Sequence, residues 1–150
     1  MRDRINQDLK TAMLAKDKQR TGTLRLISAA IKDRDIAARG AGTTAATETE
    51  LIDLLAKMVK QRQESARIYE ENARPELAAQ EHAEIAVIEE YLPRQLDEAG
   101  VSAAIAAAIA TTGAAGIKDM GKVMGELKAR HAGAMDFAKA GAAVKAALTA

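Results

Sequence analysis

The sequence predicts an all-α protein in two parts, an N-terminal four-helix domain at residues 1–92 and a small three-helix tail domain at residues 97–150. Apolar residues recur at the three- and four-residue intervals of a helix in every strongly periodic segment, and no segment alternates like a strand. Residues 93–97 interrupt this pattern between the fourth and fifth helical segments. Aromatic residues make up only 2% of the chain, so the core must be built from Leu, Ile, Val, Met and Ala.

The first two helices are expected at about residues 2–17 and 20–38, and Gly40 should end the second of them. The segment that follows, residues 40–46, consists of Gly, Ala and Thr. This composition predicts a flexible loop.

The third and fourth helices carry clear boundary signals. Thr47 is followed three residues later by Glu50, which predicts a capping box at the start of the third helix. Pro75 suits the first position of the fourth helix, where a backbone N–H is not needed. Pro93 disfavours helical geometry in the residue before it, so the fourth helix should end at residues 91–92.

The tail domain should contain a fifth helix capped by Asp97, a sixth at about residues 117–131 and a seventh capped by Asp136. Gly100 falls in the first turn of the fifth helix and is unfavourable for a firm start there. The glycines that separate the three helices are Gly113, Gly116 and Gly133.

Composition narrows the function classes. The chain has no Cys and two His, which disfavours thiolate chemistry and metal sites, and neither a Walker phosphate loop nor a G-x-G-x-x-G motif is present. We therefore expect no catalytic residue, metal or cofactor. No run approaches 18 apolar residues, so a cytoplasmic protein without a membrane segment is expected. Residues 118–145 hold six Lys or Arg against three Asp or Glu, a mild positive bias.

Three charged residues fall on apolar helix faces. Arg62 lies on that face of the third helix, and Glu81 and Glu84 lie on that face of the fourth. In an antiparallel hairpin turning near residue 73, Arg62 is expected roughly opposite residue 84. A charge on an apolar seam is costly unless it is paired, which favours a structural ion pair. The functional alternative is a Glu pair acting as acid and base or binding a metal.

The sixth helix has two distinct faces when it is read at 100° per residue. The apolar arc consists of Met120, Val123, Met124, Leu127 and His131. The opposite arc, called here the glycine–lysine face, consists of Lys118, Gly121, Lys122, Gly125 and Lys128. Each interior glycine costs a helix about 1 kcal/mol relative to Ala, so another backbone, helix or phosphate should approach there.

Two interpretations of the glycine–lysine face remain open. In the first, the glycines pack against a neighbouring helix and the lysines extend from the rim. In the second, the bare helix admits an RNA backbone and the lysines supply charge, so that the contact positions RNA without identifying its sequence. With three aromatic residues in the chain, shape recognition of a folded RNA is favoured over base stacking.

Four motifs together resemble the YqeY family. They are the run GKVMGEL at residues 121–127, the tail Val144–Leu148, the run Lys57–Ala66 and the segment Glu89–Pro93. The resemblance extends over nearly the whole chain. It implies an all-helical protein whose C-terminal part is similar to the tail domain of the B subunit of the tRNA-dependent amidotransferase.

The resemblance implies a non-catalytic accessory that binds tRNA. In the amidotransferase, a carbon–nitrogen ligase with glutamine as amido donor, the tail domain engages tRNA and other parts perform the chemistry. Amidotransferase or aminoacyl-tRNA synthetase proteins are the expected partners. The alternative is a helical protein-interaction module that docks a partner enzyme through its last three helices, and a stand-alone enzyme is least favoured.

Overall fold

The computed structural model describes all 150 residues and is entirely helical, with no strand. Seven α-helices and one 3₁₀ turn make up the regular structure. The chain divides into two compact units, Met1–Leu92 and Pro93–Ala150, which are described separately below.

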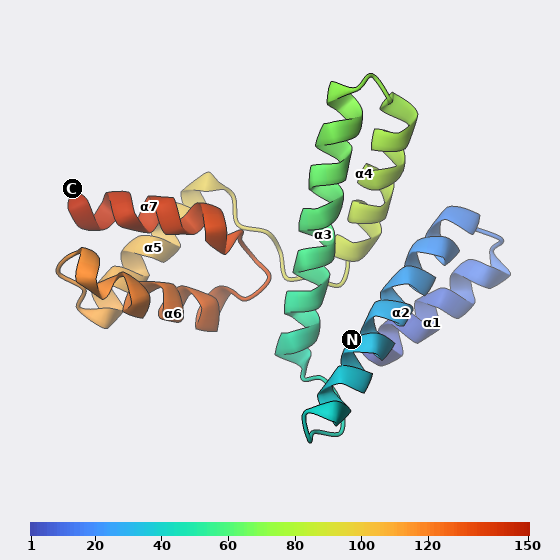
Figure 1. Cartoon of the computed structure of the whole chain (residues 1–150), viewed down its shortest axis with the longest axis horizontal. Helices are drawn as coiled ribbons and strands as arrows, with labels where there is room; N and C mark the ends of the chain where they lie inside the picture. The colour runs from blue at the N-terminus through green and yellow to red at the C-terminus, as the bar shows by residue number, and fades with distance from the viewer. The chain divides into compact units, whose positions relative to one another are not determined.

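Unit 1 consists of two helical hairpins (Figure 1). Helices α1 (Arg2–Leu14) and α2 (Lys18–Gly40) form the first, and α3 (Glu48–Glu71) and α4 (Pro75–Glu89) form the second. Helix α2 also packs against both members of the second hairpin. The side chains that are fully buried between them are Ile5, Leu24, Ile27, Leu51, Leu55 and Ile88.

Helix α1 ends at Leu14, three residues before the predicted boundary. The prediction was wrong because Lys16 has a positive φ of 57°, which breaks the helical path. Asp17 then caps α2, since its Oδ1 accepts the N–H of Arg20 at 3.0 Å, and α2 starts at Lys18 instead of residue 20.

The start of the second hairpin is as predicted. Thr47 and Glu50 form a complete capping box, in which each side chain accepts the backbone N–H of the other residue. Pro75 occupies the first turn of α4. Helix α4 ends at Glu89, so the predicted end at residues 91–92 lies in a turn that follows the helix.

The loop between α2 and α3 is anchored at Ala46, although its composition predicts flexibility. Ala46 is buried, and its N–H donates to Asp35 Oδ1 at 2.9 Å. Its carbonyl oxygen accepts a bond from an Arg2 terminal nitrogen at 2.7 Å. The same nitrogen donates to Asp35 Oδ1 at 2.6 Å. Hydrogen bonding from Arg2 and from Ala46 holds the pKa of Asp35 below its ordinary value.

A second polar cluster joins α1 and α2 to the turn after α4. The Tyr91 hydroxyl donates to Asp8 Oδ2 at 2.5 Å, and Arg20 forms an ion pair with Glu90 at 2.6 Å. The guanidinium of Arg4 lies 4.8 Å from the centre of the Tyr91 ring. Burial and the neighbouring Asp8 carboxylate raise the pKa of Tyr91, which keeps this hydroxyl protonated as a donor.

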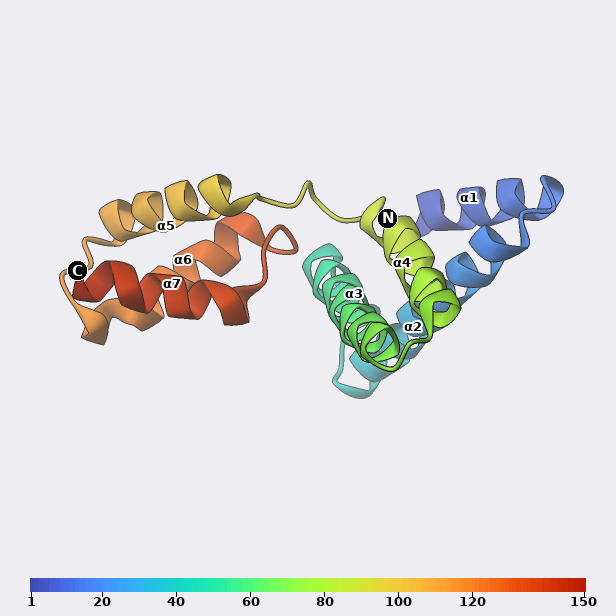
Figure 2. The ribbon, with the colours of Figure 1, turned by 90° about the horizontal axis from the view of Figure 1, so that it is seen from above.

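Unit 2 contains α5 (Glu98–Thr112), the 3₁₀ turn η1 (Ile117–Asp119), α6 (Met120–His131) and α7 (Phe137–Thr149). The three helices pack against one another in pairs (Figure 2). Their common core is small, and its buried members are Ala104, Ile105, Ala108, Val123, Leu127, Met135, Ala140 and Val144.

The expectation that Gly100 weakens the start of α5 was wrong. Asp97 caps the helix by accepting the Gly100 N–H at 2.7 Å. A Cβ at Gly100 would lie 3.1 Å from Asp97 Oδ1 and 3.3 Å from the Cβ of Leu96. The missing side chain therefore leaves room for the cap to close.

No single helix of the chain is long and apolar enough to cross a membrane. The segments Glu98–Thr112 and Ile117–His131 meet that requirement only as a pair, across a bend of 95°.

Candidate functional site

Helix α6 separates an apolar face from an exposed one. Val123 and Leu127 are completely buried in the core of unit 2, and Met120 and Met124 pack against that core. On the opposite side, every member of the glycine–lysine face is exposed: Lys118, Gly121, Lys122, Gly125 and Lys128. The local reason is the helical period, which sends the apolar and the cationic positions to opposite sides of one helix. The predicted start of the sixth helix at about residue 117 was wrong, because residues 117–119 form the 3₁₀ turn η1, so Lys118 lies just before α6.

The two glycines of this face border open space. A Cβ built at Gly121 or at Gly125 would meet no heavy atom within 4 Å beyond its own helix. The interpretation in which these glycines pack against a neighbouring helix is therefore wrong. Their effect is to leave the backbone of α6 bare between the lysines, at a cost of about 1 kcal/mol each relative to Ala.

The charges of the glycine–lysine face are only partly neutralised. Lys122 Nζ lies 3.7 Å from Asp119 Oδ1, and the Lys122 side chain is 70% exposed. Neither Lys118 nor Lys128 has an acidic partner within 4 Å. An exposed ion pair of this length contributes less than about 1 kcal/mol, so Lys122 can exchange Asp119 for another anion.

Asp119 holds the start of α6 in place. Its Oδ2 accepts the N–H of Ala115 at 3.0 Å, across the turn that η1 forms. This hydrogen bond, with smaller contributions from Lys122 and Lys118, lowers the pKa of Asp119 below its ordinary value of 3.8. The carboxylate therefore remains ionised at neutral pH and offsets one of the lysines.

We predict an acid-dependent loss of stability that Asp119→Asn removes. Because the folded state lowers the pKa of Asp119, its stabilising contribution is complete above the unfolded value and is lost as the pH falls through the folded value. Thermal unfolding of both proteins from about pH 7 to about pH 2 measures this. The variant should unfold at a lower temperature at neutral pH, and the difference should disappear in acid. A difference that stays constant over this range would contradict the assignment.

A hollow of about 380 Å³ lies between α5 and α6, and no member of the glycine–lysine face lines it. Its wall on α5 is formed by small residues, including Ala103 and Ala107. Its polar side is formed by His131 and by Arg130, which pairs with Glu126. The sequence did not indicate this hollow, since it depends on how closely the alanine-rich surface of α5 approaches α6.

Arg62 and Glu84 lie in unit 1, between α3 and α4. Arg62 Nε donates to Glu84 Oε2 at 2.9 Å, and the two side chains are only 17% and 15% exposed. A terminal nitrogen of Arg62 also donates to the Met58 carbonyl oxygen at 3.2 Å. Glu81 takes no part in this ion pair. The geometry is that of a half-buried contact that joins two helices.

No group of three or more His, Asp or Glu side chains comes together in a way that could hold a metal ion. The fold and its surfaces define a small all-helical protein whose most distinctive exposed feature is a bare, cationic helix face. The model of the YqeY family, described as Yqey-like protein, matches residues 2–148, and the chain belongs to this family.

Several fungal proteins are similar to part of the chain, and each is named "Altered inheritance of mitochondria protein 41, mitochondrial". The protein from Saccharomyces cerevisiae strain YJM789 is 35% identical over 88 residues, which cover 59% of this chain and 46% of the relative. The protein from Lachancea thermotolerans is 38% identical over 88 residues with the same coverage. The protein from Clavispora lusitaniae is 42% identical over 97 residues, which cover 63% of this chain and 54% of the relative. The chain thus spans about half the length of the curated relatives it matches.

Proposed function

We propose that this protein is a non-catalytic accessory that binds tRNA, and that it contacts the phosphate backbone through the glycine–lysine face. The observation that carries the proposal is the open space at Gly121 and Gly125 between three exposed lysines. An RNA backbone can approach a helix closely only where side chains do not hold it away. We further propose that the protein acts in the cytoplasm beside an amidotransferase or an aminoacyl-tRNA synthetase.

The surface suits backbone contact better than base stacking. None of the three aromatic residues is exposed, since Tyr91 is buried and Tyr69 and Phe137 are half-buried. Proteins that recognise single-stranded RNA stack splayed bases on exposed aromatic rings. A protein that presents lysines alone holds a folded RNA by shape and phosphate position, as a tRNA requires.

Lys118→Gln/Lys128→Gln tests the proposal with residues that have no ion pair to lose. Each lost phosphate contact should lower the magnitude of the salt slope, d log K/d log[salt], by about 0.7–0.9. The dissociation constant for total tRNA should rise roughly five- to thirtyfold at about 0.1 M salt, if each contact contributes up to about 1 kcal/mol. Filter retention across a series of salt concentrations measures both quantities.

Lys139→Gln/Lys145→Gln is the matched control for this test. Both lysines are exposed on α7 in the same unit, and the change removes the same net charge. We expect this control to retain more of the affinity and slope than the test variant. Equal losses in the two variants would mean that net charge alone attracts RNA, and would remove the glycine–lysine face as the site.

The hollow between α5 and α6 supports a second candidate function, a protein-interaction module. Its small-residue wall leaves space for an apolar side chain of a partner, and Ile117 of η1 is also exposed. Ala107→Glu would place a charge in that hollow without touching the glycine–lysine face. If this substitution abolishes association with a co-purifying enzyme and leaves tRNA retention unchanged, the hollow is the functional surface.

A further inference from the structure

Helix α2 carries four cations at seven-residue intervals, Lys18, Arg25, Lys32 and Arg39. Seven residues advance a helix by about 10.5 Å and change direction by only about 20°. The four side chains therefore leave α2 within an arc of about 60°, as a row about 32 Å long. We call these four residues the α2 cation row. The apolar spacing that predicts α2 contains no information about this row.

The α2 cation row is exposed and largely unneutralised. All four members are exposed, and the positions between them hold the exposed small residues Gly22 and Ala29. Lys18, Arg25 and Lys32 have no acidic partner within 4 Å. Arg39 donates through Nε to the Thr44 carbonyl oxygen at 3.2 Å, which leaves its terminal nitrogens available.

This lack of partners distinguishes the row from every other arginine of unit 1 except Arg74. The arginines that form ion pairs with carboxylates are Arg2, Arg4, Arg20, Arg34, Arg62 and Arg67. Beside the row, α2 offers two carboxylates. Asp35 is already held by Arg2 and by Ala46, and Asp33 is exposed. The row therefore retains most of its positive charge.

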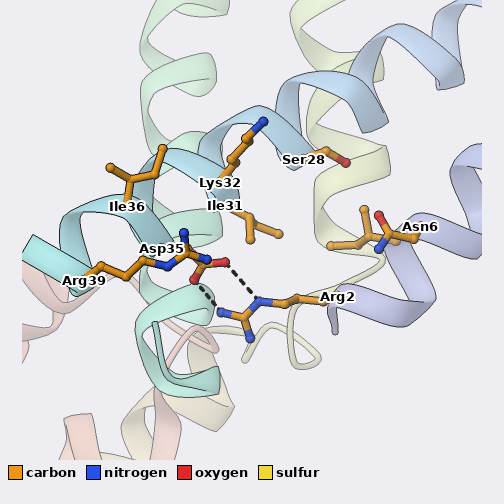
Figure 3. A pocket seen from close by; sticks show the side chains of 9 residues that line it. Arg2, Asn6, Ser28, Ile31, Lys32, Asp35, Ile36 and Arg39 are labelled. Atoms are coloured by element: carbon orange, nitrogen blue, oxygen red, sulfur yellow. Dashed lines mark hydrogen bonds and ion pairs between the residues drawn. The ribbon is translucent and has the colours of Figure 1, made fainter. Parts of the chain in front are cut away.

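Each end of the row borders a hollow between α1 and α2. The first, of about 410 Å³, is lined by Lys16, Lys18, Gly22 and Arg25 together with Met13 and Thr21. The second, of about 290 Å³, includes Lys32, Ile36 and Arg39, and its Asp35 carboxylate is joined to Arg2 (Figure 3). An extended polyanion can thus lie along α2 with space for it at both ends.

The chemistry of the row favours nucleic acid over a partner helix. A stable protein interface needs large apolar anchors near its centre. Two large exposed apolar residues, Met13 and Ile36, lie beside its ends, while its centre consists of Arg25, Gly22 and Ala29. Leu26 is also exposed, but it follows Arg25 directly and so leaves α2 about 100° away from the row. A phosphate backbone needs only spaced cations and close approach, and both are present.

We propose that the α2 cation row is a second phosphate-binding surface, through which unit 1 holds the backbone of the same class of folded RNA. The inference rests on the proposed function, because a chain that binds no RNA has no use for a second contact. The inference differs from the proposed function because it assigns RNA binding to unit 1, independently of α6.

Arg25→Gln/Lys32→Gln tests the row, and Lys57→Gln/Arg74→Gln is its matched control. Each variant of the full chain neutralises one Arg and one Lys that are exposed in unit 1 and form no ion pair. Filter retention of total tRNA measures the effect. The row variant should lower the magnitude of the salt slope by about 1.4–1.8 and raise the dissociation constant roughly five- to thirtyfold. Both changes should be larger than those of the control. Arg25→Lys/Lys32→Arg preserves the charges and should bind like the unchanged protein.

The outcomes separate this inference from the proposed function. If Lys118→Gln/Lys128→Gln weakens tRNA binding and Arg25→Gln/Lys32→Gln does not, the α2 cation row is not an RNA surface and the proposed function stands. If the unchanged protein retains no tRNA at low salt, both fail. If the row variant instead loses only binding to vesicles containing phosphatidylglycerol, or to an acidic peptide, the surface belongs to that partner and the inference is overturned. A circular dichroism spectrum checks that each variant is folded.

Discussion

Arg62→Met should lower the free energy of unfolding by about 3 kcal/mol. Removing Arg62 leaves the Glu84 carboxylate between α3 and α4 without the partner that lies 2.9 Å away. It also removes the side-chain hydrogen bond to the Met58 carbonyl oxygen. Loss of one partner from a buried ion pair costs about 3–5 kcal/mol, and partial exposure of this pair places the expectation at the low end.

The charge left behind, more than the lost attraction, is the expected cause of this effect. Arg62→Met/Glu84→Leu removes both charges and fills the seam with apolar side chains of similar length. Replacing a buried pair in this way is often neutral or stabilising, so the double variant should regain most of the loss. Urea unfolding of the single and double variants, followed by circular dichroism, measures the difference.

Arg67→Met is the matched control on the same helix. Arg67 pairs with two carboxylates, those of Glu64 and Glu71, but its side chain is 54% exposed. Exposed pairs contribute less than about 1 kcal/mol each, so this substitution should have a small effect despite removing more contacts. If Arg62→Met costs no more than Arg67→Met, the position of the pair between the helices has no energetic importance.

Local signals predicted many boundaries of the fold. Two helix starts depend only on residues within one turn of each other, so the sequence alone predicts them. They are the capping box of Thr47 and Glu50 in α3 and the Pro75 start of α4. The end of α1 was missed because nothing in the type of residue at Lys16 indicates a positive φ. Most residues avoid that region, and the capping Asp17 was the only nearby sign.

The long-range polar contacts could not be predicted from the sequence. Arg2 meets Asp35 across 33 residues, and Tyr91 meets Asp8 across 83 residues. No periodicity connects such positions, because the pairing depends on how the helices of unit 1 pack. The loop before α3 shows the consequence, since its composition predicts flexibility and Ala46 is nevertheless fixed by Arg2 and Asp35.

The two faces of α6 illustrate the same limit at the candidate site. The helical period alone predicted that Val123 and Leu127 lie inside and the lysines outside. The period is sufficient here because it compares positions along a single stretch of sequence. Whether Gly121 and Gly125 face another helix or open space depends on the positions of other helices. Only the structure distinguishes these cases, and it leaves both glycines uncovered.

Leu127→Ala should unfold unit 2 selectively and abolish the RNA contact of α6 without removing a lysine. Leu127 is 1% exposed in the core that α6 shares with the other helices of unit 2. Truncating a buried Leu to Ala costs about 2–5 kcal/mol. A single core in a domain of this size rarely supplies more than about 3–5 kcal/mol, so the loss is comparable to the whole stability of the unit.

Amide hydrogen exchange resolved by residue measures this effect, because it reports the opening of each unit separately. In Leu127→Ala, protection should fall throughout residues 98–149 and remain in unit 1 at Leu24, Leu55 and Ile88. Ile117→Ala is the control, since Ile117 is 48% exposed in the same unit and its truncation should cost less than about 1 kcal/mol. Because the lysines are arranged only by α6 and the η1 turn that leads into it, tRNA retention through this face should disappear with the protection. Retention that remains can come from the α2 cation row, so the contribution of α6 is measured by adding Lys118→Gln/Lys128→Gln to Leu127→Ala. If these substitutions still weaken retention after unit 2 has unfolded, charge without helical spacing is sufficient.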